Sequence, residues 1–267
     1  MSAESPAFDA DALGDLYAAA REAEDAGDVE TAARLFRECL EMDPEDHCGV
    51  TMRLAAFGLA SPDKAPAAYV ATLFDQHAEM FDEILVARLG YDVPALSRAL
   101  AEPFLGEHLR ILDLGCGTGL AGEAFADRAG QLVGVDLAET MLAMADERDV
   151  YTDLYIAEAV NFLEEWDEAP FDVIVATDVW PYLGDLAPFV AAAAKTLTPG
   201  GLLIASTERA ETGWRVTATQ RFAHATAYLH ETLGAAGFAI LAETPVTVRH
   251  EEGVPVDGDL LVARLAE

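Results

Sequence analysis

Apolar and polar positions follow two different periods along this chain, and the period changes near Leu109. Before that point apolar residues recur every three to four positions, which is typical of helices that bury one face. Gly27-Asp28 and then Asp43-Pro44 interrupt the first two helical runs, so these two form an αα-hairpin. The pattern predicts helices over residues 10–26, 29–42, 48–59, about 67–90 and 93–100.

After Leu109 short apolar runs alternate with helical patterns. Helices separate the first five runs, which is typical of a parallel, doubly wound sheet. No helix separates the last two runs, so they pair antiparallel. We therefore expect an α/β fold with a seven-stranded, Rossmann-like sheet whose last strand is antiparallel. The predicted strands are Arg110–Leu114, Gln131–Val135, Leu154–Ala157, Phe171–Ala176, Leu202–Thr207, Phe238–Thr244 and Leu260–Arg264.

The proline-containing segment 61–66 marks a boundary between the two parts. We expect an all-α segment over 1–62 and a second domain over 63–267. Within the second domain, residues 63–105 are expected to be helical and residues 106–267 to form the α/β core.

A glycine-rich loop follows the first predicted strand, at Gly115, Gly117 and Gly119. Glycine permits positive φ and a close approach of ligand to backbone, and the amides that open the next helix favour electron-rich ligand atoms. Asp136 ends the second strand, where an acid can accept ribose hydroxyls. The spacing is G-x-G-x-G rather than the dinucleotide pattern G-x-G-x-x-G. Asp113, two residues before the loop, can orient the ammonium group of a cofactor that carries an amino acid.

At these residues the chain resembles the class I S-adenosylmethionine-dependent methyltransferases. The matching segments are I-L-D-L-G-C-G-T-G at 111–119, V-G-V-D at 133–136, F-D-V-I-V-A-T-D-V at 171–179 and L-T-P-G-G at 197–201. The resemblance covers about residues 66–267. It implies that S-adenosylmethionine is the cofactor, that S-adenosylhomocysteine is the product and that the fold is the methyltransferase sheet.

The resemblance also implies which residues bind the cofactor. Leu137 and Met141 stand where relatives place apolar side chains against adenine, and Ala159 follows the third strand where relatives contact the adenine edge. Glu158 occupies a position that is usually Asp. The implied binding residues are Asp113, Gly115, Cys116, Gly117, Gly119, Asp136, Leu137, Met141, Glu158, Ala159 and Thr177.

The N-terminal helices resemble one tetratricopeptide repeat of about 34 residues. Gly27 and Asp28 take the turn, and Ala32, Phe36 and Pro44 take the small, aromatic and proline positions, while Leu16 and Ala20 depart from the first helix's pattern. With Y-V-A-T-L-F-D-Q-H-A-E-M-F-D at 69–82 and R-F-A-H at 221–224, the architecture resembles predicted methyltransferases with such a short N-terminus. A single repeat does not form a stable solenoid, so we expect the hairpin to pack on the rest of the chain.

The net charge and the cysteine content limit the classes of partner and ligand that the protein is expected to bind. The 267 residues include 48 acidic and 16 basic side chains, a formal net charge of -32, which repels nucleic-acid phosphates and anionic membranes. Three cysteines build no disulfide framework, and no Cys/His spacing suits zinc, so no metal is expected. The N-terminus shows no signal-peptide pattern and no apolar run reaches a membrane span. A reduced cytoplasm is the simplest compartment.

Because the sulfonium activates the methyl group, the protein has mainly to align a nucleophile and exclude water. A general base helps only an acceptor that arrives protonated. The candidate catalytic residues are Asp178, Tyr182, His224 and His77; Trp180, Glu208, Trp214, Arg221, Phe74 and Phe81 are further candidates for the acceptor pocket. Phe74, His77 and Phe81 share a helical face, and the resemblance implies that their helix covers the cofactor cleft as a lid.

Three functions remain open. The first is methyl transfer to a small molecule. The second is protein methylation, with the N-terminal helices recruiting the target protein, and the third is cofactor binding without turnover. The run Asp178-Val-Trp-Pro-Tyr182 is similar to the (N/D)-P-P-(Y/F) element of enzymes that methylate amide or base nitrogens. It is one residue too long, lacks the second proline, and meets an acidic chain that disfavours DNA or RNA.

Overall fold

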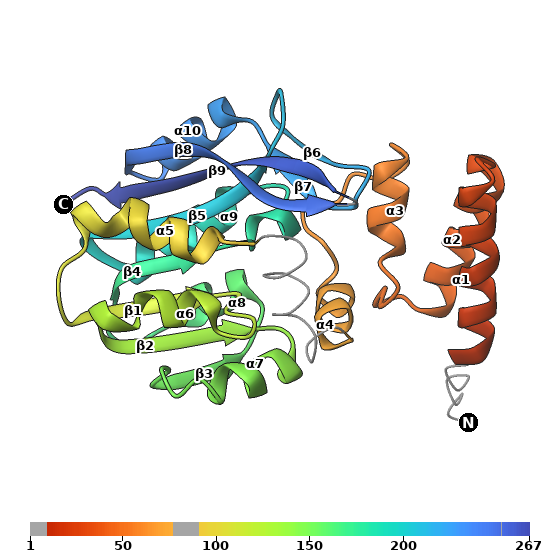
Figure 1. Ribbon diagram of the computed structural model, residues 1–267. Coiled ribbons are helices and arrows are strands. Elements are labelled where there is room, and N and C mark those ends of the chain that lie inside the picture. The colour runs from red at the N-terminus through yellow and green to blue at the C-terminus, as the bar shows by residue number, and fades with distance from the viewer. Residues whose placement is uncertain (1–9, 77–90, 252) are drawn as a thin grey trace.

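A computed structural model describes residues 10–76, 91–251 and 253–267 (Figure 1). At the N-terminal end α1 (Ala10–Asp25) packs antiparallel on α2 (Val29–Met42), as the sequence predicts. Gly27 makes the turn at φ 77°, and Asp28 caps α2 by accepting a hydrogen bond from the Thr31 N–H at 3.1 Å. Phe36 is fully buried between these helices.

A third helix, α3 (Val50–Ala56), has two buried faces. Val50 and Leu54 pack against the α1–α2 hairpin, while Met52 points the other way and packs with Tyr182 and Phe222. Figure 1 shows α3 standing between the hairpin and the sheet. The hairpin is thus joined to the rest of the protein through a buried apolar contact, as expected for a repeat too short to stand alone.

The sheet has nine strands within the described residues. Its hydrogen-bonded order is β3-β2-β1-β4-β5, after which β5 pairs with both β7 and β9. The first five strands are parallel, β9 runs antiparallel to β5, and β8 runs antiparallel to β9. The strands are β1 (Leu109–Leu114), β2 (Ala129–Asp136), β3 (Asp153–Ile156), β4 (Phe171–Ala176), β5 (Leu197–Arg209), β6 (Trp214–Val216), β7 (Phe222–His224), β8 (Phe238–Glu251) and β9 (Val254–Leu265).

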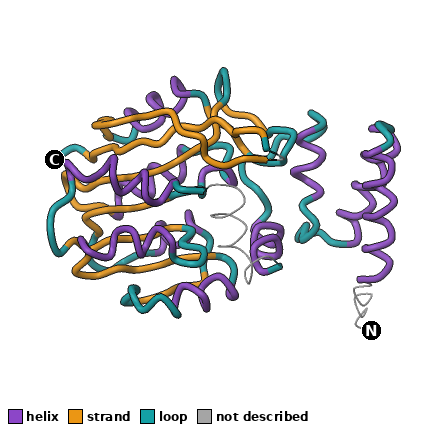
Figure 2. Tube along the Cα trace, viewed as in Figure 1, coloured by secondary structure: helices purple, strands orange, loops and turns teal. Residues whose placement is uncertain are grey.

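Helices cover both faces of this sheet (Figure 2). On one face α5 (Val93–Ala101) and α6 (Leu120–Phe125) enclose a core around Ile111 and Phe125, and α7 (Glu139–Asp146) lies beside β2 and β3. The other face is covered by α8 (Ala159–Glu165), α9 (Ala187–Thr196) and α10 (Thr226–Ala235). Short 3-10 turns occur at Glu102–Phe104, Ala126–Arg128 and Trp180–Tyr182.

The fold confirms the predicted doubly wound sheet and its antiparallel last strand, and it adds what the pattern missed. The hairpin β6–β7 has three residues in each strand, too few to show an alternation. β8 and β9 extend well beyond the predicted ends because they pair with each other past the edge of β5. The helix predicted over 67–90 is observed as α4 (Ala67–Asp75), with Gln76 as its C-cap, and residues 77–90 lie outside the described residues.

Candidate functional site

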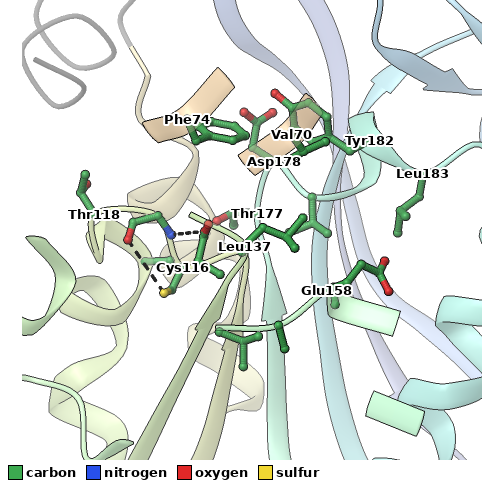
Figure 3. Close-up of a pocket in the computed structure, with 18 of the residues that line it drawn as sticks. Val70, Phe74, Cys116, Thr118, Leu137, Glu158, Thr177, Asp178, Tyr182 and Leu183 are labelled. Carbon is green, nitrogen blue, oxygen red and sulfur yellow. Dashed lines mark hydrogen bonds between the residues drawn. The ribbon is translucent and has the colours of Figure 1, made fainter. Parts of the chain in front are cut away.

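One cleft gathers most of the predicted cofactor residues at the carboxyl ends of β1, β2 and β4 (Figure 3). It encloses about 980 Å³ of empty space, its open mouth included. The loops after these strands form the floor. Residues of α4 and its approach, together with Tyr91 and Pro94, form the opposite wall.

The glycine loop lies in the cleft wall with a backbone that suits glycine. Gly115 and Gly117 line the cleft and have φ values of 64° and 53°. A Cβ on Gly115 would lie 2.6 Å from the Val179 Cγ2 atom, so the loop after β4 fits closely over it. Gly119 also has a positive φ, 90°, but it does not line the cleft. It faces Arg148 and Tyr151 instead.

The Asp136 carboxylate holds the glycine loop to the end of β2. Its Oδ2 accepts a hydrogen bond from the Gly117 N–H at 2.9 Å, and its Oδ1 accepts one from the Ala138 N–H at 2.9 Å. Burial raises the pKa of Asp136, and these amides oppose the shift. The Leu137 N–H also bonds to this carboxylate, so about one of its roughly four lone-pair sites remains for a ligand hydroxyl.

Asp113 lies beneath the loop rather than in the cleft wall. It is 1% exposed, and its Oδ2 accepts a hydrogen bond from the Tyr151 hydroxyl at 2.7 Å. Burial raises its pKa to about 7, opposed by Tyr151 and the Gly122 N–H. Tyr151 is not among the predicted site residues, because no local pattern in the sequence connects it to Asp113.

The predicted adenine wall is only partly in the cleft. Leu137, Glu158 and Ala159 line it, whereas Met141 is fully buried and packs with Ala138 and Phe74. The Glu158 side chain caps α8 by accepting a hydrogen bond from the Asn161 N–H at 2.9 Å. Its carboxylate also lies 3.7 Å from the Lys64 Nζ. Figure 3 shows that carboxylate turned away from Leu137.

Polar groups meet apolar rings where the loop leaves β4. Asp178 and Tyr182 line the cleft beside Phe74, whose ring meets Tyr182 edge-on at 5.5 Å between centroids (Figure 3). Asp178 has a positive φ of 60°, and its N–H donates to Ser206 Oγ at 2.9 Å. Arg221 Nη1 donates to both Asp178 oxygens at 3.3–3.4 Å and its guanidinium lies 5.1 Å from the Tyr182 ring centroid.

His224, a predicted catalytic candidate, lies outside the cleft. It is fully buried, its Nε2 lies 2.8 Å from the Leu183 carbonyl oxygen, and its Nδ1 lies 2.6 Å from Thr207 Oγ1. Burial lowers its pKa to about 4, so the ring is neutral at pH 7. Through these contacts, the buried His224 side chain connects β7 to the loop after β4. That position corrects the catalytic expectation.

The remaining candidates divide clearly. Cys116 and Thr177 line the cleft, and the Tyr91 hydroxyl bonds to Thr177, a contact that no sequence signal indicated. Trp180 is fully buried against Phe189 and belongs to the core. His77 and Phe81, the central residues of the expected lid, lie outside the described residues.

Comparison with known proteins identifies the central part of the sheet. Residues 112–205 match the family model described as a methyltransferase domain. They are an S-adenosylmethionine-dependent methyltransferase domain. The chain is 39% identical over 109 residues to a ubiquinone biosynthesis O-methyltransferase of Maricaulis maris, an alignment that covers 39% of this chain and 42% of that protein. The chain thus spans less than half the length of this curated relative.

Two solved structures share the fold of the methyltransferase domain. The Burkholderia thailandensis 1,6-didemethyltoxoflavin-N1-methyltransferase is 21% identical with a TM-score of 0.58, over 78% of this chain and 93% of that one. The [4+2]-cyclase SpnF is 21% identical with a TM-score of 0.60, over 75% and 97%. Since one is named as a methyltransferase and the other as a cyclase, this likeness shows the fold alone.

No helix among residues 10–76, 91–251 and 253–267 combines the length and the apolar character needed to cross a membrane.

Proposed function

We propose that this protein transfers a methyl group from S-adenosylmethionine to a small-molecule acceptor. The observation that carries the proposal is a single cleft in which the glycine loop, Asp136 and the end of β4 meet within a methyltransferase domain. The glycine loop and Asp136 suit the nucleoside end of the cofactor, and the β4 end supplies polar and aromatic groups for an acceptor.

The residues in the cleft fit the cofactor. Asp136 keeps a lone-pair site for a ribose hydroxyl, while its bonds to Gly117 and Ala138 hold the carboxylate in place. Leu137 and Ala159 offer an apolar surface to adenine. One Glu158 oxygen already accepts the hydrogen bond from the Asn161 N–H, so its second oxygen is the one available to the adenine amino group.

The remaining assignments follow from burial. Cys116 and Thr177 line the cleft through small side chains that permit a close approach. Asp113 acts indirectly, because Tyr151 lies against its carboxylate beneath the loop. Met141 supports the adenine wall from behind through Phe74 and Ala138.

When bound, S-adenosylmethionine supplies an electrophilic methyl group. The chain has then to orient the acceptor and keep water away. Phe74, Val70 and Tyr182 cover the cleft with apolar surface, and Asp178 provides a hydrogen-bond acceptor beside them. Asp178 is therefore the group we assign to receive the acceptor's proton.

The wall around the cleft supports a small acceptor over a protein target. Backbone pairing joins the approach to α4 with the loop after β4: the Ala65 N–H donates to the Tyr182 oxygen at 2.8 Å, and the Gly184 N–H donates to the Asp63 oxygen at 2.7 Å. The N-terminal helices press on the same loop through Met52. We assign the segment 1–62, with its tetratricopeptide-like hairpin, a structural role in the same enzyme and place the protein in a reduced cytoplasm, consistent with its three free cysteines.

Two measurements test this function. Calorimetry with S-adenosylhomocysteine should give one binding site per chain. Incubation with methyl-labelled S-adenosylmethionine and cell extract should then place the label in the low-molecular-weight ultrafiltrate. Label in the protein fraction alone would favour protein methylation, and saturable cofactor binding without label transfer would favour a binding protein without turnover.

A further inference from the structure

The end of β4 contains a buried hydroxyl without a partner. Tyr182 is 8% exposed and lines the cleft, yet its hydroxyl oxygen makes no hydrogen bond to any described residue. Leaving a buried hydroxyl unpaired costs free energy, so a ligand atom that bonds to it would recover that cost. The Tyr182 hydroxyl is therefore a site for a polar ligand atom.

Asp178 presents a carboxylate beside this hydroxyl, and both are held by the same side chain. The Arg221 guanidinium bonds to Asp178 and stacks on the Tyr182 ring. The Ser206 hydroxyl accepts from the Asp178 N–H and fixes the left-handed backbone of that residue. A hydrogen-bond acceptor and a donor are thus fixed next to each other at one end of the cleft.

The other surfaces at this end are apolar and aromatic. Phe74 meets the Tyr182 ring at an interplanar angle of 70°, and Val70 and Leu183 continue the wall. Figure 3 shows Val70, Phe74, Asp178 and Tyr182 gathered at the same end of the cleft. A flat, apolar ligand body would bury its faces against these side chains.

Charge selects a neutral ligand. Among the described residues, the cluster here holds two guanidinium groups, Arg221 and Arg249. It also holds three carboxylates, since Asp178 pairs with Arg221, and Arg249 pairs with Glu208 at 2.7 Å and with the partly exposed Glu251 at 2.6 Å. The excess is one negative charge, and the sulfonium of the cofactor would offset it. An anionic ligand would restore the excess, and a cationic ligand would have to compete with Arg221 for Asp178.

We infer that Asp178 and Tyr182 form the acceptor subsite and that it takes a neutral aromatic molecule bearing a protonated nucleophile, O–H or N–H, next to a second hydrogen-bonding heteroatom. This inference rests on the proposed function. In the transfer, a lone pair on the nucleophile forms the bond to the methyl carbon, and the carbon–sulfur bond breaks with its electrons left on sulfur. The nucleophile's proton passes to Asp178 and then to water. Arg221 is a positioning residue.

Binding to the protein saturated with sinefungin tests the inference without requiring turnover. Sinefungin is a non-reacting S-adenosylmethionine analogue whose amine supplies the positive charge of the sulfonium. Three naphthalenes of similar size serve as calorimetric probes: neutral 2,3-dihydroxynaphthalene, anionic 2-naphthoate and cationic 2-naphthylmethylammonium. We expect the neutral probe to bind about tenfold more tightly than either charged probe. Preference for a charged probe, or no binding of any probe, would overturn the inference.

Variants locate the probe. Tyr182→Phe and Asp178→Asn should each weaken binding of the neutral probe by about threefold to tenfold, the usual effect of one lost hydrogen bond. Tyr228→Phe is the matched control, because the Tyr228 hydroxyl bonds to Asp185 and Leu186 outside the cleft. Equal affinity of wild type and Tyr182→Phe for the probe would remove Tyr182 from the subsite.

Arg221 needs a readout that separates positioning from folding. Probe affinity should fall in the order wild type, Arg221→Lys, Arg221→Met, because lysine keeps the charge and loses the planar contact with Tyr182. All variants should retain their affinity for S-adenosylhomocysteine, which contacts other residues. A wild-type protein that does not bind S-adenosylhomocysteine would instead contradict the proposed function. Failure of the acceptor subsite and failure of the proposed function are therefore distinguishable.

Discussion

The Tyr151 hydroxyl donates a hydrogen bond to the Asp113 carboxylate beneath the glycine loop, and this pair is separated from the cleft that the loop lines. Tyr151 also fills the space beside two glycines: a Cβ on Gly122 would lie 2.2 Å from its hydroxyl oxygen, and one on Gly134 would lie 2.8 Å from its ring. Loop, strand and Tyr151 are thus packed as one unit around a buried carboxyl group.

The buried Asp113 carboxyl group should make the free energy of unfolding depend on pH. The folded-state pKa of Asp113 is raised to about 7, so between about pH 4 and 7 the unfolded chain binds fewer protons than the folded one. The contribution of Asp113 to stability therefore falls as pH rises through this range. Asp113→Asn should gain stability relative to wild type by about 2–4 kcal/mol between pH 4 and 8. Urea unfolding at both pH values measures this, and a constant difference would contradict it.

His224 should change the pH dependence of stability in the opposite direction. Burial lowers its folded-state pKa to about 4, so as pH falls from about 6.5 to 4 the unfolded chain binds the extra proton and stability is lost. Wild type should lose about 2–3 kcal/mol more than His224→Gln over that range. Unfolding curves at the two pH values test this. Methyl transfer by His224→Gln at pH 7 should stay near the wild-type rate, and its abolition in a folded variant would restore a catalytic role.

Asp136→Ala should weaken S-adenosylhomocysteine binding by about 1–3 kcal/mol, because it removes the ribose acceptor and frees the Gly117 and Ala138 amides. Calorimetry measures the change. Asp153→Ala, at an exposed position on β3, is the control and should bind normally. Normal binding by Asp136→Ala would remove this residue from the site.

Two glycines with nearly the same φ make it possible to distinguish the effect of backbone strain from the effect of losing ligand contact. Gly117 has φ 53° in the cleft wall, and Gly213 has φ 52° with open space around its Cβ position. Gly117→Val and Gly213→Val should lower the melting temperature comparably, since both place a branched residue at positive φ. Only Gly117→Val should lose cofactor binding in a titration. Retained binding would show that the loop does not face the cofactor.

The buried Met52 connects the N-terminal helices to Tyr182 at one end of the cleft. Met52→Ala should destabilise the protein by about 2–5 kcal/mol, whereas Met42→Ala, at a residue 37% exposed, should change stability by less than about 0.5 kcal/mol. Chemical unfolding compares the two. Cofactor affinity should persist in Met52→Ala, because Asp136 and the glycine loop lie elsewhere in the cleft. An unchanged unfolding free energy would mean that α3 does not anchor the hairpin.

Local sequence patterns predicted the helices, strands and loops whose periodicity or motif lies within a short stretch of the chain. The period of three to four residues gave α1 and α2 almost to the residue, and the alternation of strands and helices gave the doubly wound sheet. Motif spacing brought Gly115, Gly117, Asp136, Leu137 and Ala159 to one cleft, because the carboxyl ends of neighbouring parallel strands meet at one edge. The β6–β7 hairpin escaped detection, because three-residue strands show no period.

The sequence by itself determined the fold class, the methyltransferase domain and the cofactor, since each depends on periodicity or on a motif within one strand and its loop. Tertiary structure alone decided which side chains reach the cleft. It buried His224 and Met141, turned Asp113 toward Tyr151, and joined Asp178, Tyr182 and Arg221 from two segments about 40 residues apart. Side-chain direction at a strand end depends on what packs above it, and that packing involves residues that are distant in the sequence.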